Sequence, residues 1–341
     1  MKRSLALLAL AACALAASMG TGRDASALVH PMSVDDAVIA GDSLPRTLAE
    51  FGFFQDDGAR IPDPRLVPYE LNTALYSDGA DKLRYLYVPA HKQVTADGDG
   101  VLQFPVGTAI IKTFAFGEGS GQRFIETRVL VHRADGWTAL PYRWNAEQTE
   151  ARLALAGGRL PITRADGKTF SYRIPNKNQC KTCHSVDDAV VPIGPAVRNL
   201  SPELLAELAD RQILAAQPVS SDPMPRWGDE TAGVAGRARA YLDVNCAHCH
   251  RPGGSASNSG LDLSWEQRDA FAIGVNKPPV AAGRGAGGLL VSIAPGEPDK
   301  SILVHRMQST ETGVAMPELG RASVDDEALA VIRAWIEEMG E

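Results

Sequence analysis

Two copies of a C-x-x-C-H pentapeptide constrain this chain more than any other feature. They occupy residues 180–184 and 246–250, and together they use every cysteine except Cys13. C-x-x-C-H is the attachment motif of c-type haem, in which both thiols add to the haem vinyl groups and the histidine binds the iron. The sequence therefore predicts two covalently attached haem c groups. The predicted thioether links and iron ligands are Cys180, Cys183, His184, Cys246, Cys249 and His250.

A zinc site is the main alternative for a pair of C-x-x-C units. Four cysteines can hold zinc in tetrahedral geometry. The gap between the two units is long for a zinc ribbon, however, and zinc would leave both trailing histidines without a role. Haem attachment accounts for all six residues and is the preferred interpretation.

Length and charge limit the classes of function. A chain of 341 residues is long enough for two or three compact units. Its formal net charge of −7 argues against nucleic acid or an anionic membrane surface as a partner. The same charge is compatible with a redox protein partner that presents a basic surface.

Residues 1–16 have the pattern of a secretory signal peptide. Lys2 and Arg3 precede an apolar stretch that is too short to span a bilayer. Residues 14–16 fit an A-x-A cleavage site, whereas residues 10–13 resemble a lipobox that would make Cys13 a lipid anchor. Both alternatives predict export to the periplasm, where c-type haem is attached. No later segment is apolar enough to predict a transmembrane helix.

The segment 42–175 alternates apolar and polar residues with a period of two, which predicts half-buried strands. The alternation is clear at residues 82–88, 108–116, 123–131, 137–144 and 168–174. Asp-Gly pairs at 135–136 and 166–167 predict turns. We expect an antiparallel β domain, either a sandwich or a barrel.

The segment 176–230 carries the first motif. It enters Cys180 from a strand-like stretch, with no obvious helix in front. Ser201 is a candidate N-cap, with Pro202 at the first helical position, of a helix that reaches about Leu214.

The segment 231–341 carries the second motif and is expected to be helical at both ends. Small and apolar residues recur at helical spacing between 235 and 242 and lead into Cys246. Residues 328–339 place apolar side chains on one helical face. A glycine- and proline-rich stretch, 253–296, lies between. The predicted fold class is thus multidomain, with an N-terminal antiparallel β domain followed by a mostly α-helical c-type cytochrome region.

This last segment resembles a class I cytochrome c domain. The resemblance depends on the helix ending in the second motif, on Ala315-Met316-Pro317, and on the amphipathic C-terminal helix. It implies that His250 is the proximal ligand and Met316 the distal ligand. A thioether ligand favours ferrous iron and raises the reduction potential, which suits electron transfer.

The distal ligand of the first haem is left open by the sequence. Met224 precedes a proline, as Met316 does, and is one candidate. The free histidines are alternatives, namely His30, His91, His132 and His305. If none of these residues binds, the first iron has the open position that a peroxidase-like or ligand-binding haem requires.

The order of leader, β domain and two haem motifs resembles a family of poorly characterised exported dihaem c-type cytochromes. The matching residues are 76–82, 104–108, 126–128, 178–180 and 245–250. The resemblance implies haem binding and electron transfer to or from a redox partner. Two alternatives stay open: a haem oxidoreductase with a substrate pocket near the β domain, and a β domain that docks another exported protein. Polar residues for such a pocket would be Asp81, Lys82, Glu126, Arg128 and His132.

Overall fold

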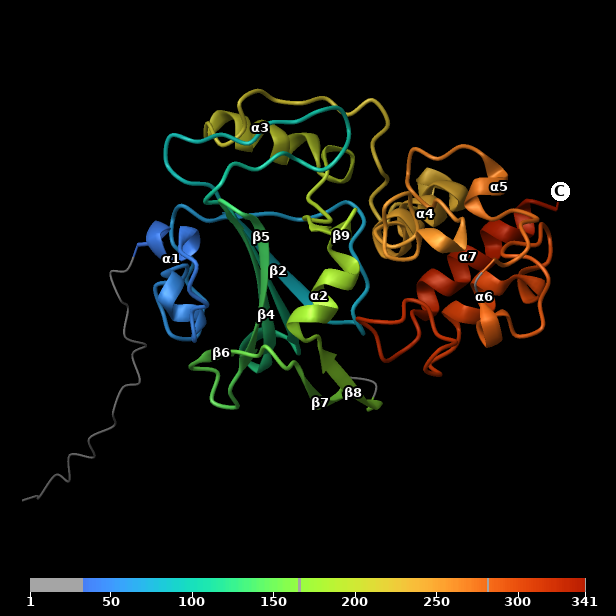
Figure 1. Cartoon of the computed structure of the whole chain (residues 1–341), viewed down its shortest axis with the longest axis horizontal. Helices are drawn as coiled ribbons and strands as arrows, with labels where there is room; N and C mark the ends of the chain where they lie inside the picture. Colours follow the sequence, from blue (N-terminus) through green and yellow to red (C-terminus); the bar gives the residue numbers. More distant parts are fainter. Residues whose placement is uncertain (1–32, 165–166, 281, 341) are drawn as a thin grey trace, which may run out of the picture.

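The computed structural model describes residues 33–164, 167–280 and 282–340 (Figure 1). The predicted leader, Cys13 and His30 lie outside these residues. The described strands are β1 (Val67–Pro68), β2 (Asp81–Tyr87), β3 (Ala109–Phe116), β4 (Arg123–Arg133), β5 (Gly136–Trp144), β6 (Ala151–Leu153), β7 (Gly158–Thr163), β8 (Thr169–Ile174), β9 (Ser185–Val186) and β10 (Ala189–Val190). The described α-helices are α1 (Asp36–Ala40), α2 (Lys177–Cys183), α3 (Pro202–Asp210), α4 (Gly233–Leu242), α5 (Ala270–Ile273), α6 (Ile302–Met307) and α7 (Asp326–Glu338).

A six-stranded antiparallel sheet with strand order β1 to β6 forms the centre of the N-terminal part. The five stretches with a period of two correspond to β2, β3, β4, β5 and β8, and the predicted turn at 135–136 joins β4 to β5. The other predicted turn includes Asp166, which lies outside the described residues. The described sheet is not a barrel, because its edge strands β1 and β6 do not pair with each other. It is not half of a sandwich either, because the N-terminal segment packs on one face and the first-motif segment on the other. The helix α1 lies on one side of the sheet and α2 on the other (Figure 1).

The two faces of the sheet belong to different hydrophobic cores, because successive side chains of a strand point to opposite faces. On one face, Ile111, Val129 and Tyr142 pack with Ile39 and Phe51 from the N-terminal segment. On the other face, the apolar cluster includes Leu86, Ile110, Leu130, Cys180, Val197 and Leu205. The first C-x-x-C-H motif is therefore built directly onto the sheet.

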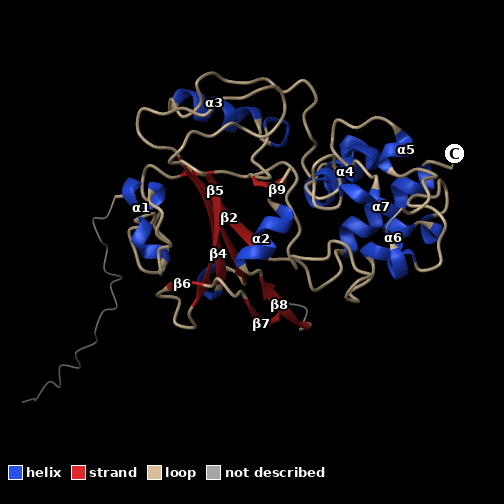
Figure 2. Cartoon of the chain, viewed as in Figure 1, coloured by secondary structure: helices blue, strands red, loops and turns tan. Residues whose placement is uncertain are grey.

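The prediction of a mostly α-helical cytochrome region after residue 175 was wrong. The helices there are short, from the four residues of α5 to the thirteen of α7, and loops and turns join them (Figure 2). Glycine and proline in a helix interior cost about 1 and about 3 kcal/mol relative to alanine. The described part of the glycine- and proline-rich stretch 253–296 therefore forms single turns and the short helix α5.

The observed helix boundaries agree with the predicted capping residues at some positions and differ from the prediction at others. The Ser201 side chain caps α3 as predicted, but the helix ends at Asp210 rather than near Leu214. The unpredicted helix α2 begins after Asn176, whose side chain and that of Gln179 cap each other's backbone N–H groups. The predicted helix before Cys246 exists as α4, and residues Asp243–Ala247 continue it as a π-helix.

The apolar face predicted for the last helix is confirmed. Ala328, Val331, Ile332, Trp335 and Ile336 of α7 are buried. They form one core with residues of α4 and with loop residues, including Ala238, Tyr241, Leu242, Leu263 and Ile293.

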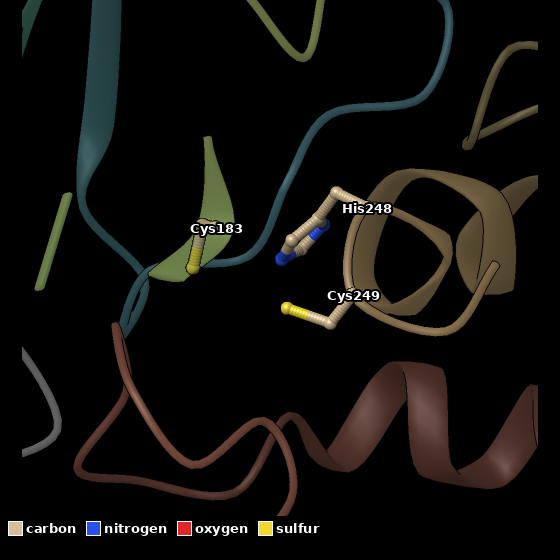
Figure 3. Close-up of side chains that lie close together, drawn as sticks. All are labelled: Cys183, His248 and Cys249. Carbon is tan, nitrogen blue, oxygen red and sulfur yellow. The ribbon is translucent and has the colours of Figure 1, made fainter. Parts of the chain in front are cut away.

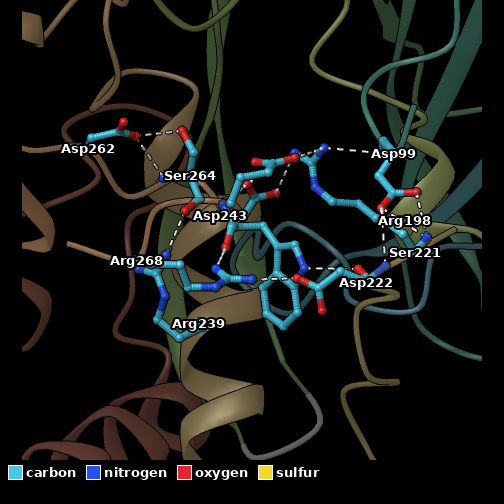
Figure 4. Close-up of polar contacts among 11 residues, drawn as sticks. Asp99, Arg198, Ser221, Asp222, Arg239, Asp243, Asp262, Ser264 and Arg268 are labelled. Atoms are coloured by element: carbon cyan, nitrogen blue, oxygen red, sulfur yellow. Dashed lines mark hydrogen bonds and ion pairs between the residues drawn. The ribbon is translucent and has the colours of Figure 1, made fainter. Parts of the chain in front are cut away.

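A polar network joins the C-terminal part to the first-motif segment (Figure 4). Arg198 forms ion pairs with Asp243 at 3.2 Å and with Glu266 at 2.9 Å. The indole Nε1 of Trp265 donates to the Asp222 carbonyl oxygen at 3.0 Å. The Asp99 carboxylate accepts hydrogen bonds from the backbone of residues 221 and 222. These contacts fix the position of one C-x-x-C-H motif relative to the other.

Candidate functional site

The first motif opens onto a cavity of about 410 Å³ between the sheet and the C-terminal part. Cys180, Cys183 and His184 all line it, together with apolar side chains such as Ile110 and Leu130. Cys180 and Cys183 belong to α2, and His184 follows at its C-cap. The three predicted attachment residues of the first haem thus share one pocket, and its volume lies in the range of ligand sites in proteins.

The imidazole of His184 is arranged as a metal ligand would be. Its Nδ1 lies 3.0 Å from the Val191 carbonyl oxygen and donates a proton to it, which leaves Nε2 for another partner. Burial, reinforced by the nearby positive charge of Lys112, lowers the pKa of His184 to about 3. The ring is therefore neutral, which is the form that binds metals.

The second motif opens onto a separate cavity of about 430 Å³. Cys246, Cys249, His250 and Met316 line it. The Nδ1 of His250 lies 2.9 Å from the Ser259 hydroxyl oxygen, and that hydroxyl donates onward to the Ala256 carbonyl oxygen. Nδ1 is therefore the donor and Nε2 is left for a ligand, while burial lowers the pKa of His250.

The loop that carries Met316 is held by a partly buried network around Arg321. The Arg321 guanidinium donates to the carbonyl oxygens of Met316 at 2.8 Å, Ser309 at 2.8 Å and Arg306 at 3.1 Å. The Met316 N–H donates to the Arg306 carbonyl oxygen at 3.0 Å. Met316 is thus fixed in the wall of the same cavity as His250.

The two cavities share a wall. Cys183, Asn245 and His248 line both of them. The sulfur atoms of Cys183 and Cys249 and a ring nitrogen of His248 all lie within 4.8 Å of one another (Figure 3). Hydrogen bonding from the Cys183 thiol to Cys249 lowers the pKa of Cys249 and raises that of Cys183. The imidazole of His248 is 5% exposed, and its Nδ1 has no hydrogen-bond partner in the described structure.

Three cations form a row across the sheet inside the first cavity. Arg84, Lys112 and Arg128 are register neighbours on β2, β3 and β4, and all three line the cavity. Arg128 forms an ion pair with Glu126, which also accepts a 2.7 Å hydrogen bond from the Tyr172 hydroxyl. The default expectation for polar strand residues is a solvated face. Here Glu126 is completely buried instead, because the motif segment covers that face.

The remaining candidate ligands lie elsewhere. Met224 is 3% exposed and packs against Ala240, Val244 and Trp265, outside the residues that line either cavity. His91 lies exposed in a turn. The His132 ring stacks on Trp137 and contacts the Phe104 carbonyl oxygen. Neither of these histidines, nor His305, lines the two cavities.

A turn that sequence reasoning did not assign to a site supports the second motif. The Tyr76 N–H donates to the Asn245 side chain at 2.7 Å, next to Cys246. The Asp78 carboxylate accepts from the N–H groups of Ala322 and Ser323 at 2.7 and 2.8 Å, just beyond the Met316 loop. The sequence signal that could have revealed this turn is the Ser-Asp-Gly triplet, in which Asp78 and Gly79 both adopt positive φ angles.

Comparisons with known proteins do not place the chain in a family. No family model, curated protein or solved structure matches it. Among the described helices, none combines the length and the apolar character needed to cross a membrane.

Proposed function

We propose that this protein is an exported dihaem c-type cytochrome that passes electrons between its two haem groups and a redox protein partner in the periplasm. The main support for the proposal is that each C-x-x-C-H motif lies at a cavity. Each C-x-x-C-H motif lines its own cavity, and the cavities share a wall at Cys183 and His248. The resemblance to exported dihaem cytochromes supports the same function.

The residues in both cavities fit a covalently attached haem. Each cavity offers two cysteine sulfurs and a neutral histidine whose Nδ1 is already engaged, which orients Nε2. Haem iron at these positions would supply reversible one-electron oxidation and reduction. The chain's own role is to hold the ligands, to exclude water with apolar walls, and to set each potential through ligand and burial.

The two sites are unequal in ways that favour different roles. Met316 lines the second cavity, and none of the described candidate histidines does. Met316 is therefore the proposed distal ligand of the second iron. The first cavity holds neither Met224 nor the described candidate histidines, but it holds a row of cations. This observation favours a second candidate function, a haem oxidoreductase whose first iron has an open position near a charged pocket.

The test is to produce the full chain in a host that attaches c-type haem and to measure covalent haem by mass and by haemochrome spectrum. We expect two haem groups per chain. The double variant Cys180→Ala/Cys183→Ala should lose one, and Cys246→Ala/Cys249→Ala should lose the other. Cys13→Ala is the matched control and should retain both groups.

Absence of covalent haem from the wild-type chain would refute the proposal. The group formed by Cys183, His248 and Cys249 would then be read as a soft-metal site, because two thiolates and an imidazole suit zinc. Metal analysis of the same sample distinguishes that outcome, since thioether formation consumes both sulfurs. Redox titration and electron paramagnetic resonance of the haem-loaded protein then distinguish the two candidate functions. Two low-spin irons support an electron carrier, and a high-spin first iron supports an enzyme.

A further inference from the structure

The first cavity concentrates positive charge in a protein whose net charge is −7. Its charged lining consists of the cations Arg84, Lys112, Arg128, Arg198, Arg251 and Arg321 and the acids Asp243 and Glu266. Both acids form ion pairs with Arg198. They therefore do not neutralise the cations on the sheet side of the cavity.

Two of the sheet cations form no close ion pair among the described residues, although Glu70 acts on Arg84 and Glu126 acts on Lys112 at longer range. Arg128 pairs with Glu126, but the only hydrogen bond of Arg84 goes to the Lys82 carbonyl oxygen at 3.2 Å. The Lys112 ammonium lies 5.3 Å from the centre of the Phe114 ring and forms no ion pair in the described structure. Arg84 is 9% exposed. A buried cation outside a close ion pair is costly unless it loses its proton or an anion binds beside it, and an arginine such as Arg84 keeps its charge.

The position of this pair is also specific. Arg84 and Lys112 are directly opposite each other on β2 and β3, so both side chains project from one sheet face. Burial and the neighbouring cations depress the pKa of Lys112, and the charge of Lys112 in turn contributes to lowering the pKa of His184. The pair and the proposed iron ligand His184 line the same cavity.

We propose that Arg84 and Lys112 form an anion site in the first cavity, which binds a carboxylate or a small oxyanion. The inference rests on the proposed function only for the source of that anion. With haem attached at Cys180 and Cys183, the carboxylates can be the haem propionates, or they can belong to a small substrate bound near the iron. Without haem, the same cations still provide the site.

The test measures binding of acetate and of sulfate by calorimetry to the full chain in two forms. One form carries both haem groups, and the other is the Cys180→Ala/Cys183→Ala variant that lacks the first. Saturable binding to the fully loaded form, with a shift in the spectrum of the first haem, supports a site for a free anion. Binding to the variant alone supports occupation of the row by the haem propionates.

Substitutions then assign the binding to this pair. Arg84→Gln and Lys112→Gln should each weaken anion binding by roughly tenfold or more, the value of a charge-assisted hydrogen bond. Arg143→Gln and Lys92→Gln are the matched controls, because both residues are exposed cations outside the cavity lining. They should leave the affinity unchanged.

The proposal is overturned if neither form binds either anion, or if both glutamine variants bind as tightly as the wild type. Circular dichroism of each variant separates loss of binding from loss of fold. If the wild-type chain carries no haem but still binds acetate through Arg84 and Lys112, the anion site stands and the cytochrome proposal fails. The two proposals can therefore fail independently.

Discussion

At the residue scale, the chain contains two methionines that precede a proline, and the sequence made each a candidate iron ligand, Met316 through a resemblance and Met224 as one of several alternatives. The structure separates them. Met316 lies in a loop held by Arg321 and lines the cavity of His250. Met224 is buried in a small cluster with Val244 and Trp265. A thioether can bind iron only if it lines the haem cavity, so the two side chains should respond differently to substitution.

If the proposed haem groups are attached, we predict that Met316→Leu lowers the potential of the second haem, whereas Met224→Leu leaves both potentials unchanged. Leucine has a similar volume but no sulfur, so the first change removes a ligand that stabilises ferrous iron. The second change should cost less than about 1.5 kcal/mol of stability. Redox titration with electron paramagnetic resonance checks both. A shift of the first haem's potential in Met224→Leu would instead identify Met224 as its ligand.

At the scale of elements, the turn at Tyr76 to Gly79 connects the β sheet to the second motif. Its backbone and side chains contact Asn245 on one side and residues 322–324 on the other. Asp78 is 1% exposed, and one of its oxygens accepts from two N–H groups and the Ser323 hydroxyl. This turn therefore fixes the end of the loop in which Met316 lies.

We predict that Asp78→Ala destabilises the protein by about 1–3 kcal/mol, because it leaves the partly buried N–H groups of Ala322 and Ser323 without this acceptor. Asp81→Ala is the matched control, since Asp81 is exposed at the start of β2. Chemical unfolding of the two variants measures the difference. Equal stability of the two variants would show that the turn does not hold the loop.

The sequence predicted the elements whose pattern depends on local residues. The strands β2 to β5 followed from alternation, and the start of α3 followed from Ser201 and Pro202. The helix α2 was missed, because it spans only seven residues and its capping by Asn176 is the only local signal. The expectation of a mostly helical region failed because the glycine- and proline-rich stretch between α4 and α7 forms mainly loops and turns.

The candidate site could be predicted only in part, for a different reason. The predicted attachment residues are contiguous, so spacing alone was enough to propose them. The row of Arg84, Lys112 and Arg128 joins residues from three strands, and it exists only through the strand register. The approach of Cys183 to Cys249 joins two motifs far apart in the sequence. Neither arrangement has a signal in a single sequence.

At the scale of the whole molecule, the relation between the two cavities depends on the contacts of Arg198. The side chains of Arg198 and Asp243 are only 12% and 11% exposed. Asp243 directly follows α4, in the π-helical turn that leads to Cys246, and it also accepts from the Trp265 N–H at 2.8 Å. The pair thus links the first-motif segment to the backbone that carries the second motif.

We predict that Arg198→Met costs about 3–5 kcal/mol of stability at neutral pH, because it leaves a buried carboxylate without its partner. Burial raises the pKa of Asp243 even though Arg198 opposes the shift, and loss of Arg198 should raise that pKa further. A carboxyl group with a raised folded pKa binds more protons in the folded state than in the unfolded state. The deficit should therefore shrink as the pH falls from neutrality toward about 4.

Arg211→Met is the control variant for the stability loss expected in Arg198→Met. Arg211 pairs with Glu207 at 3.3 Å, but both side chains are substantially exposed, so the loss should be below about 1 kcal/mol at any pH. Chemical unfolding of both variants across this pH range gives the two curves. A deficit in Arg198→Met that stays constant with pH would mean that Asp243 is not the charge left behind.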